Sequence, residues 1–465
     1  MKKLFLPILS GLLAALCFPK FGFFPLAWIA LVPLFIDLKE REGPKDAAGA
    51  GLAFGLVFFG VNLFWINTLN HFAPGFAALG YIVLIAGEAL FVAVLCYVLK
   101  FLSRSFPPLN PLTYPVAWTF FEWLRTAGPF GITAGELGYS QAPFLPLVQI
   151  ASFSRVFGVS FLIVMMNAAL ADSFVVFQKK PAGRQLLVLS MSCLLLLSAG
   201  LWGVEQLTAP VKSDHTLKIA VIQGNIPQDE KLDARFNNEI FSIHETLTRG
   251  VTQEHPDLII WPESVVLSYL VDNRDLFPRV RQLARDSRAY LLIGTPFYTD
   301  TSNIYNSLIC VSPTGEITGR YDKQRIVPFG EYLPFRPLLL PILQLTGFFR
   351  QDFDFGPAKA ELLEAKGLKI GGMICFESTF ADLAAERKKQ GARMLLTITN
   401  DAWFGNSSAP YDHFDCGVFR AVENREWFVQ CANTGISGVI DPYGRVVART
   451  GVSQRRALTF EVPLP

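Results

Sequence analysis

A cysteine and an acidic residue close the apolar stretch 369–377, Lys-Ile-Gly-Gly-Met-Ile-Cys-Phe-Glu. An apolar run that contains glycines and ends abruptly at polar residues predicts a buried strand that carries Cys375 to its carboxyl end. Reactive groups of α/β folds lie at that end of a strand. A free thiol has a pKa of about 8.5, so a nucleophilic cysteine needs a base and a cation beside it. Cys375 is therefore the candidate nucleophile.

Two upstream motifs provide a base and a cation. Glu263 closes the apolar run Leu258-Ile-Ile-Trp-Pro-Glu, and Lys323 follows a Tyr-Asp pair, each at or just beyond an expected strand end. We interpret Glu263 as the general base that takes the thiol proton, and Lys323 as the cation that stabilises the thiolate and the tetrahedral oxyanion. One preorganised donor in that role is worth about 3 kcal/mol. The alternatives are a turn-capping carboxylate and a solvated surface lysine.

Further charged residues lie close to these motifs in the sequence. Glu331 and Glu377 are expected to hold Lys323 or to position the base, with an ordinary salt bridge as the alternative for each. Cys310 also ends an apolar strand, but Val-Ser-Pro follows it, so it serves as a negative control. His413 is expected on a helix face, because a glutamate already fills the role of the base.

Aromatic residues near the same motifs are candidates for substrate contacts. Phe376, next to the nucleophile, is expected to support the site, and Tyr332, Trp403 and Phe404 are expected to bind substrate. The run 329–349 is too apolar for an exposed loop and too rich in proline for a membrane span. It is either a lid that contacts lipid or a buried helix and loop of the domain.

Composition restricts the class of protein. The 465 residues have a mean hydropathy of +0.35 and only 17% charged residues, so part of the chain belongs in a membrane. The formal net charge is +2 and no basic stripe with exposed aromatics is found, so no nucleic-acid partner is expected. The seven cysteines form no CxxC pair and no zinc-like spacing with histidine, so we expect neither a disulfide framework nor a metal or other cofactor.

Residues 1–204 are expected to form an α-helical transmembrane bundle of about seven spans. The run 185–204 has no charged residue and is long enough to cross a hydrocarbon core about 30 Å thick. Comparable runs, some of them short or interrupted by proline, lie at 4–19, 24–38, 47–70, 75–99, 110–124 and 156–177.

The distribution of Lys and Arg predicts the orientation of this bundle. Ten cations lie in alternate connections and three on the other side, which places the N-terminus in the cytoplasm. An odd number of spans then places the rest of the chain in the periplasm, with the bundle in the cell inner membrane. The start of the chain also resembles a lipoprotein signal peptide, but Leu16 precedes Cys17 where a small residue is usual.

Polar positions within the bundle leave alternatives open. Glu88 lies in the middle of an expected span, where a carboxylate is either functional or a partner in helix packing. The stretch 130–149 contains too many Gly and Pro residues for a span. It is a candidate wall of a lipid portal.

After a linker at 205–216, residues 217–465 are expected to form one layered α/β domain, because strand and helix patterns alternate. Helices are expected near 232–252, 275–286, 379–390 and 412–426. Strands are expected at 217–224, 257–261, 289–294, 305–311, 369–375, 394–399, 428–432, 436–441 and 457–462.

Three sequence blocks carry a family resemblance. Trp261-Pro-Glu-Ser, Tyr321-Asp-Lys with Pro328-Phe-Gly-Glu, and Ile374-Cys-Phe-Glu with Asn400-Asp-Ala-Trp-Phe-Gly look like the signature blocks of the carbon-nitrogen hydrolase (nitrilase) superfamily. The preceding bundle, with Glu-Leu-Gly-Tyr-Ser-Gln at 136–141 and Gln-Gly-Asn-Ile-Pro-Gln at 223–228, narrows the resemblance to the apolipoprotein N-acyltransferase family. This chain has Leu232 where that family often has an aromatic residue. The family commonly carries a further span after the domain, whereas this sequence stops at Pro465.

The resemblance implies a nitrilase-like α-β-β-α sandwich on the periplasmic side, with Glu263, Lys323 and Cys375 as the catalytic triad. It further implies acyl transfer from a membrane phospholipid, through a thioester on the cysteine, to the α-amine of a diacylated apolipoprotein. The residues themselves predict only cysteine-dependent acyl transfer at a membrane. The alternatives are a membrane-anchored amidase that uses water, and a transporter with an inactive hydrolase-like domain. Nothing in the sequence specifies an oligomeric state, and we expect a monomer.

Overall fold

The computed structural model describes residues 2–105, 110–128, 130–177, 183–210, 213, 215–266, 268–299, 303–344 and 352–464. The chain divides into two compact units, Met1–Ala209 and Pro210–Pro465, called here the helical unit and the α/β unit. Helix α9 (Gly183–Thr208) extends four residues into the expected linker, which therefore begins as helix at residues 205–208.

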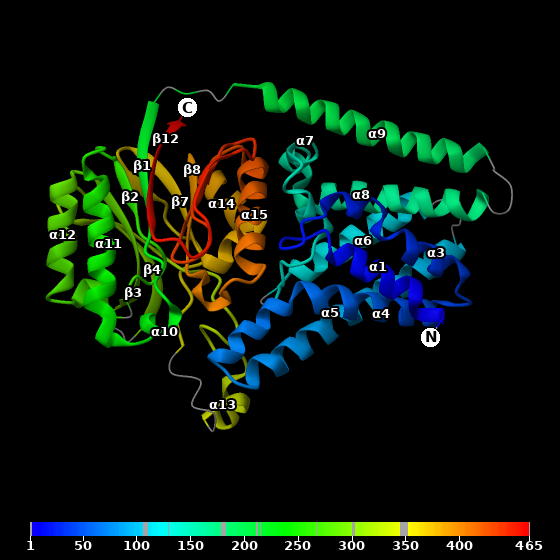
Figure 1. Cartoon of the computed structure of the whole chain (residues 1–465), viewed down its shortest axis with the longest axis horizontal. Coiled ribbons are helices and arrows are strands. Elements are labelled where there is room, and N and C mark those ends of the chain that lie inside the picture. Colours follow the sequence, from blue (N-terminus) through cyan, green and yellow to red (C-terminus); the bar gives the residue numbers. More distant parts are fainter. Residues whose placement is uncertain are drawn as a thin grey trace. The chain divides into compact units, whose positions relative to one another are not determined.

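The helical unit consists of helices of very different lengths (Figure 1). In chain order they are η1 (Lys2–Leu4), α1 (Phe5–Ala15), η2 (Phe24–Leu26), α2 (Ala27–Ala30), α3 (Val32–Glu40), α4 (Pro44–Asn62), η3 (Phe64–His71), α5 (Phe76–Ser105), α6 (Asn110–Thr126), η5 (Leu137–Gln141), α7 (Leu145–Val148), α8 (Ala151–Phe177) and α9.

Three helices of the described residues are long and apolar enough to cross a membrane: α5, α8 over Ala151–Phe174, and α9. A fourth crossing is obtained if α4 and η3, which are bent by 48°, count as one broken span. The other expected spans are also helical, but α1 has 11 residues and α6 has 17, so at 1.5 Å per residue both are shorter than a 30 Å core. The total of seven spans therefore remains a prediction.

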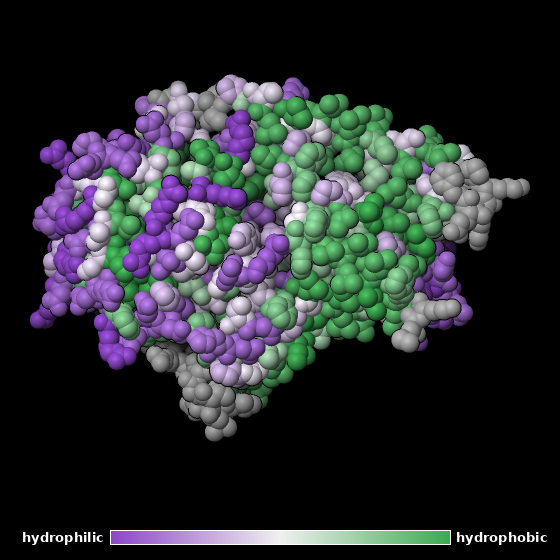
Figure 2. Space-filling view, in the orientation of Figure 1, coloured by the Kyte–Doolittle hydropathy of each residue, from purple (hydrophilic) through white to green (hydrophobic). Residues whose placement is uncertain are grey.

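Apolar side chains cover the outside of the helical unit. Along α9, Leu187, Met191, Leu194, Leu197 and Leu201 are each about 60% exposed, between 59% and 64%. Figure 2 shows a broad hydrophobic surface over the helical unit, whereas the α/β unit presents a largely hydrophilic surface. Exposed apolar area on this scale is unfavourable in water, so this surface is suited to lipid.

Polar groups of the helical unit lie inside. Asn167 of α8 accepts hydrogen bonds from the backbone N–H groups of Leu31 and Val32 at 2.9 and 3.1 Å, which satisfies the donors exposed at the break between α2 and α3. Glu88 Oε2 lies 2.9 Å from Arg125 Nε, so α5 is paired with α6. This contact favours the helix-packing interpretation of Glu88. In the stretch 130–149 the only helices are the short η5 and α7, and all five residues of η5 are buried.

The α/β unit alternates strands and helices. Its elements are β1 (His215–Gln223), α10 (Gln228–Lys231), η6 (Ala234–Phe236), α11 (Asn237–Thr252), β2 (Leu258–Ile260), η7 (Leu270–Asp272), α12 (Leu276–Ser287), β3 (Tyr290–Tyr298), β4 (Ile304–Val311), β5 (Ile317–Asp322), α13 (Arg336–Gln344), β6 (Leu363–Ala365), β7 (Leu368–Ile374), η8 (Cys375–Thr379), α14 (Ala381–Lys389), β8 (Met394–Thr399), η9 (Asp401–Phe404), α15 (Ala409–Asn424), β9 (Trp427–Ala432), β10 (Gly438–Ile440), β11 (Val446–Arg449) and β12 (Arg456–Leu464).

Two six-stranded sheets, in the orders β12-β1-β2-β3-β4-β5 and β11-β10-β9-β8-β7-β6, form the centre of this unit. Their facing residues make one apolar core, in which Ile219, Leu258 and Leu308 of the first sheet pack with Ile370, Leu396 and Val429 of the second. Helices α11 and α12 cover the outer face of the first sheet, and α14 and α15 cover that of the second (Figure 1). The expected α-β-β-α sandwich is confirmed.

Each strand range predicted for the α/β unit is present, but the strands β5, β6 and β11 lie outside the predicted ranges. Of β5, only its end just before Lys323 was expected. All three contain exposed positions, and β6 and β11 form the free edges of the second sheet while β5 forms one edge of the first. An edge strand is partly exposed to solvent, so fewer of its residues must be apolar. Its sequence therefore lacks the continuous apolar run that marks a central strand.

Candidate active site

Cys375 stands at a sharp turn. It follows β7, the strand predicted to deliver it, and begins η8 with a φ of 51°, which is left-handed backbone that a residue with a side chain rarely adopts. Such a strained strand-to-helix turn lifts a nucleophile out of the sheet, as in other enzymes that use a nucleophile elbow. The side chain is half-buried. Cys375 therefore has the backbone geometry of a presented nucleophile.

Glu263 lies beyond the end of β2, in the other sheet, and is buried. Gly294 of β3 permits this position, because a Cβ there would lie 2.7 Å from the Glu263 Cα and 2.5 Å from the preceding carbonyl oxygen. Asn306 Nδ2 donates a hydrogen bond of 2.7 Å to Glu263 Oε1. Lys323 Nζ lies 3.4 Å from the same oxygen. The expected base and cation are thus in contact.

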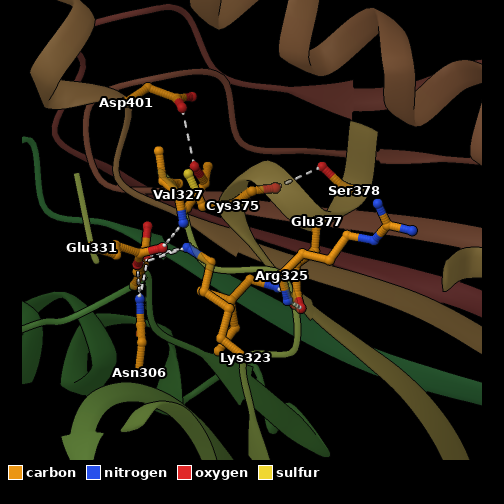
Figure 3. A network of polar contacts seen from close by, with 12 residues as sticks. Asn306, Lys323, Arg325, Val327, Glu331, Cys375, Glu377, Ser378 and Asp401 are labelled. Atoms are coloured by element: carbon orange, nitrogen blue, oxygen red, sulfur yellow. Dashed lines mark hydrogen bonds and ion pairs between the residues drawn. The ribbon is translucent and has the colours of Figure 1, made fainter. Parts of the chain in front are cut away.

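Lys323 is almost completely buried, with 1% of its surface exposed. It follows β5, and its ammonium lies 2.9 Å from Glu331 Oε1. Asn306 bridges the two carboxylates, since it also donates to Glu331 Oε1 at 2.8 Å. Figure 3 shows Lys323 and Asn306 converging on Glu331, whose other oxygen accepts the Val327 N–H at 2.7 Å. Glu331 therefore contacts the cation directly, and its role in the reaction stays a prediction.

Glu377 acts on the backbone instead. Its carboxylate accepts hydrogen bonds from the N–H groups of Gln324, Arg325 and Ile374 at 2.6, 2.9 and 2.8 Å, and from the Tyr321 hydroxyl. It thereby ties the loop after Lys323 to the strand end before the nucleophile. Glu377 was expected to hold Lys323 or to position the base, and these hydrogen bonds go to residues around Lys323 and to the residue before Cys375. Its role in the reaction stays a prediction.

The charges in the site favour an ionised base and a protonated thiol. Burial by itself would raise the pKa of Glu263, but Lys323, the Asn306 hydrogen bond and Lys231 together hold that pKa below its ordinary value. Burial first, and then the Glu263 charge, raise the pKa of Cys375 against the opposing effect of Lys323. The pKa of Lys323 is raised because Glu331 and Glu263 outweigh its burial. These shifts favour a thiol on the candidate nucleophile and an ionised carboxylate on the candidate base.

Asn306 and Lys231 are site residues that the sequence did not reveal. Lys231 of α10 is 2% exposed, donates to the backbone carbonyl of Glu263 at 2.7 Å, and has a pKa lowered to about 8 chiefly by burial. Asn306 is a buried amide in the largely apolar strand β4. Two signals were available in the sequence: a polar residue inside a predicted strand, and a lysine three residues after the block at 223–228.

The aromatic candidates occupy separate places. Phe376 packs edge-on against Phe380, with ring centroids 4.8 Å apart. Tyr332 is half-buried and its ring lies 5.2 Å from that of Phe355. Trp403 and Phe404 form the half-buried end of η9, after β8. Their substrate contacts remain predictions.

Cys310, the control cysteine, lies in an environment that differs from that of Cys375. Cys310 is completely buried in the core between the sheets, and burial raises the pKa of its thiol. Its sulfur donates a long hydrogen bond of 3.6 Å to the Glu364 carbonyl. Among the residues that the structure describes, no cluster of three or more His, Cys, Asp or Glu side chains is arranged to hold a metal ion.

Glu263, Lys323 and Cys375 lie at strand ends of an α-β-β-α sandwich. The family model described as "Carbon-nitrogen hydrolase" matches residues 218–465, so the α/β unit is of the carbon-nitrogen hydrolase class. The model described as "Apolipoprotein N-acyltransferase N-terminal domain" matches residues 10–169. The chain belongs to the apolipoprotein N-acyltransferase family.

Similar proteins extend over nearly the whole chain. An apolipoprotein N-acyltransferase from Geobacter metallireducens is 37% identical over 98% of this chain and 88% of its own length. One from Methylococcus capsulatus is 32% identical over 99% of this chain and 90% of its own length. Among solved structures, Nit3 of Saccharomyces cerevisiae, a member of branch 10 of the nitrilase superfamily, matches 55% of this chain and 93% of its own, with 18% identity and a TM-score of 0.43.

Proposed function

We propose that this protein transfers a fatty acyl group from a membrane phospholipid to the α-amine of the N-terminal diacylglyceryl-cysteine of apolipoproteins, through a thioester on Cys375. The observation that carries the proposal is a buried base and cation beside a presented cysteine, in a chain whose other unit has a lipid-suited surface. Membership of the apolipoprotein N-acyltransferase family supports the lipoprotein acceptor.

In the first step Glu263 takes the thiol proton while the sulfur attacks the ester carbonyl of the phospholipid. Lys323 stabilises the oxyanion of the tetrahedral intermediate. The carbon–oxygen bond to the glycerol then breaks, and protonated Glu263 returns the proton to the leaving alkoxide. A lysophospholipid departs and the acyl-thioester of Cys375 remains.

In the second step the lipoprotein amine attacks the thioester carbonyl. Glu263 takes a proton from the attacking nitrogen, and the second tetrahedral intermediate again faces Lys323. The carbon–sulfur bond breaks, the sulfur recovers its proton from Glu263, and an amide is released. The enzyme returns to its resting state with an ionised base and a protonated thiol, the state favoured by the charges of the site.

The segment around α13 is proposed to contact lipid and to shield the thioester from water. Phe335 and Leu338 are 67% and 72% exposed, which supports a lid more than a buried helix and loop. The part of the run at 345–349 lies outside the described residues. Replacing both side chains by Ser is expected to shift product from acylated lipopeptide toward free fatty acid, with Val447→Ser, at an exposed position of β11, as the matched control. An unchanged ratio of the two products would show that this segment does not shield the thioester from water.

The proposed location is the cell inner membrane, with about seven spans and the α/β unit in the periplasm. The excess of Lys and Arg in alternate connections, ten against three, supports this orientation. A periplasm-dependent reporter fused after Pro465 is expected to be active, and activity of a cytoplasm-dependent reporter at the same position would reverse the topology.

Mass spectrometry of enzyme and products tests the reaction. Phospholipid alone should give a stable acyl-enzyme and about one lysophospholipid per enzyme, the burst of a two-step mechanism. Adding a diacylated lipopeptide should restart turnover and yield the triacylated peptide. Continuous release of fatty acid without lipopeptide, and without a trapped acyl-enzyme, would establish the water-using hydrolase instead.

A further inference from the structure

The backbone carbonyl of Cys375 is held by two side chains from outside the base and cation cluster. His413 Nε2 of α15 lies 3.1 Å from this oxygen, and the Ser378 hydroxyl donates to it at 3.0 Å. His413 Nε2 also lies 2.7 Å from the Ser378 oxygen. Cys375 has a strained φ of 51°, which persists only where the surrounding structure holds it. These contacts to its carbonyl help to hold that backbone conformation.

The partners of the His413 ring determine its protonation. Nδ1 lies 3.1 Å from Asp401 Oδ1, and Nε2 faces the carbonyl of Cys375. A carboxylate and a carbonyl only accept hydrogen bonds, and the Ser378 hydroxyl, whose one proton goes to the Cys375 carbonyl, accepts at Nε2. This arrangement places a proton on both ring nitrogens. Burial would lower the pKa of His413, but Asp401 raises it above its ordinary value. His413 is thus an imidazolium paired with a buried carboxylate, and not merely a histidine on a helix face.

The same carboxylate is linked to the other end of the nucleophile. The Thr399 hydroxyl, at the end of β8, donates to Asp401 Oδ1 at 3.0 Å. Thr399 is also a side-chain hydrogen-bond partner of the Cys375 thiol. Figure 3 shows Asp401 facing Cys375 from the side opposite Lys323. The pair of Asp401 and His413 therefore reaches the backbone of the cysteine directly and its sulfur through a threonine.

We infer that Asp401 and His413 are positioning residues for the nucleophile, and that His413 sets the direction of a backbone oxyanion donor. The carbonyl of Cys375 and the N–H of Phe376 are opposite ends of one planar trans peptide. Fixing the carbonyl therefore fixes the N–H next to the nucleophile. This inference rests on the proposed function, because it assigns that N–H to the tetrahedral oxyanion together with Lys323.

Two variants that differ in the position of one nitrogen test the inference. His413→Gln places an amide N–H near the original Nε2, where it can still donate to Cys375. His413→Asn places it near Nδ1, where it keeps Asp401 and loses the carbonyl. We expect His413→Asn to slow acyl-enzyme formation at saturating phospholipid by about 100-fold, the scale of one lost oxyanion donor, and His413→Gln by less than about 10-fold. The phospholipid concentration at half-maximal rate should be unchanged in both.

The inference would be overturned if both variants lost the same factor in the rate of acyl-enzyme formation. It would also be overturned if the loss of rate paralleled a fall in the thermal midpoint, because His413 would then have only a structural role. If neither variant folds, Asp401→Asn decides: it keeps the shape of the side chain and removes its charge. A slowing of about 10-fold with an unchanged thermal midpoint supports the inference, and an unchanged rate overturns it. Failure of the wild-type protein to form any acyl-enzyme would instead refute the proposed function.

Discussion

Each unit of the chain contains a buried cation that lies between two carboxylates. In the helical unit, Arg125 lies 2.9 Å from Glu88 and 3.8 Å from Glu136. In the α/β unit, Lys323 lies 2.9 Å from Glu331 and 3.4 Å from Glu263. A buried ion pair is costly to desolvate, so neither cluster is explained by stability alone.

The surroundings separate the two clusters. Arg125 joins α5 to α6, and neither carboxylate oxygen of Glu136 has a hydrogen-bond partner among the described residues. In the α/β unit, Asn306 donates to both carboxylates, and the charges of Lys323 and Glu263 act on the Cys375 thiol. The first arrangement holds helices together and the second sets protonation states. A buried ion pair therefore indicates a catalytic role only when its charges act on a reactive side chain nearby.

Removing the nucleophile should have the largest effect. Cys375→Ala is expected to abolish the acyl-enzyme, because Cys375 carries the thiol on which the charges of Glu263 and Lys323 act. Cys310→Ala is the matched control, since it removes a thiol that is buried in the core of the same unit. The measurement is the intact mass of the protein after incubation with phospholipid. An adduct that survives in Cys375→Ala and disappears in Cys310→Ala would contradict the assignment of the site.

Neutralising the base should have the next largest effect. Glu263→Gln keeps the hydrogen-bonding shape but cannot take a proton, so acyl-enzyme formation should slow by about 10³-fold. The rate constant comes from single-turnover experiments at saturating phospholipid. A loss of less than about tenfold would show that another group accepts the thiol proton.

The pH dependence of the first step should report the lowered pKa of Glu263. The base acts only when ionised, and its pKa lies below the ordinary value of about 4.3. The single-turnover rate should therefore stay constant as pH falls from 7 to 5, and decline only at lower pH. An acid limb between pH 6 and 7 would mean that burial, not Lys323, decides the protonation of the base.

The smallest effect on chemistry is expected in the helical unit. Glu88→Gln should leave acyl-enzyme formation within about threefold of the wild type and lower the thermal midpoint. The stability loss should be below the roughly 3–5 kcal/mol of a stranded buried charge, because Glu136 remains beside Arg125. A large loss of acyl-enzyme formation at an unchanged thermal midpoint would show that the cluster around Arg125 also acts on the reaction, which contradicts its structural role.

The sequence alone predicted the elements that carry the reactive groups. Apolar runs ending at Glu263 and Cys375 identified β2 and β7, since a strand buried on both faces needs continuous hydrophobicity. The same signal located the helices of the first unit. It could not count the spans, because helix length and breaks such as the 48° bend after α4 depend on packing.

Tertiary structure decided which polar groups meet. Asn306, Lys231 and His413 come from β4, α10 and α15, far apart in sequence, and nothing in their local patterns states that they point to one site. The protonation state of Cys375 also depends on the tertiary structure. A neighbouring lysine suggested a thiolate, but burial and the Glu263 charge outweigh it. Local sequence determines periodicity and strand ends, whereas desolvation and charge depend on everything that folds around a group.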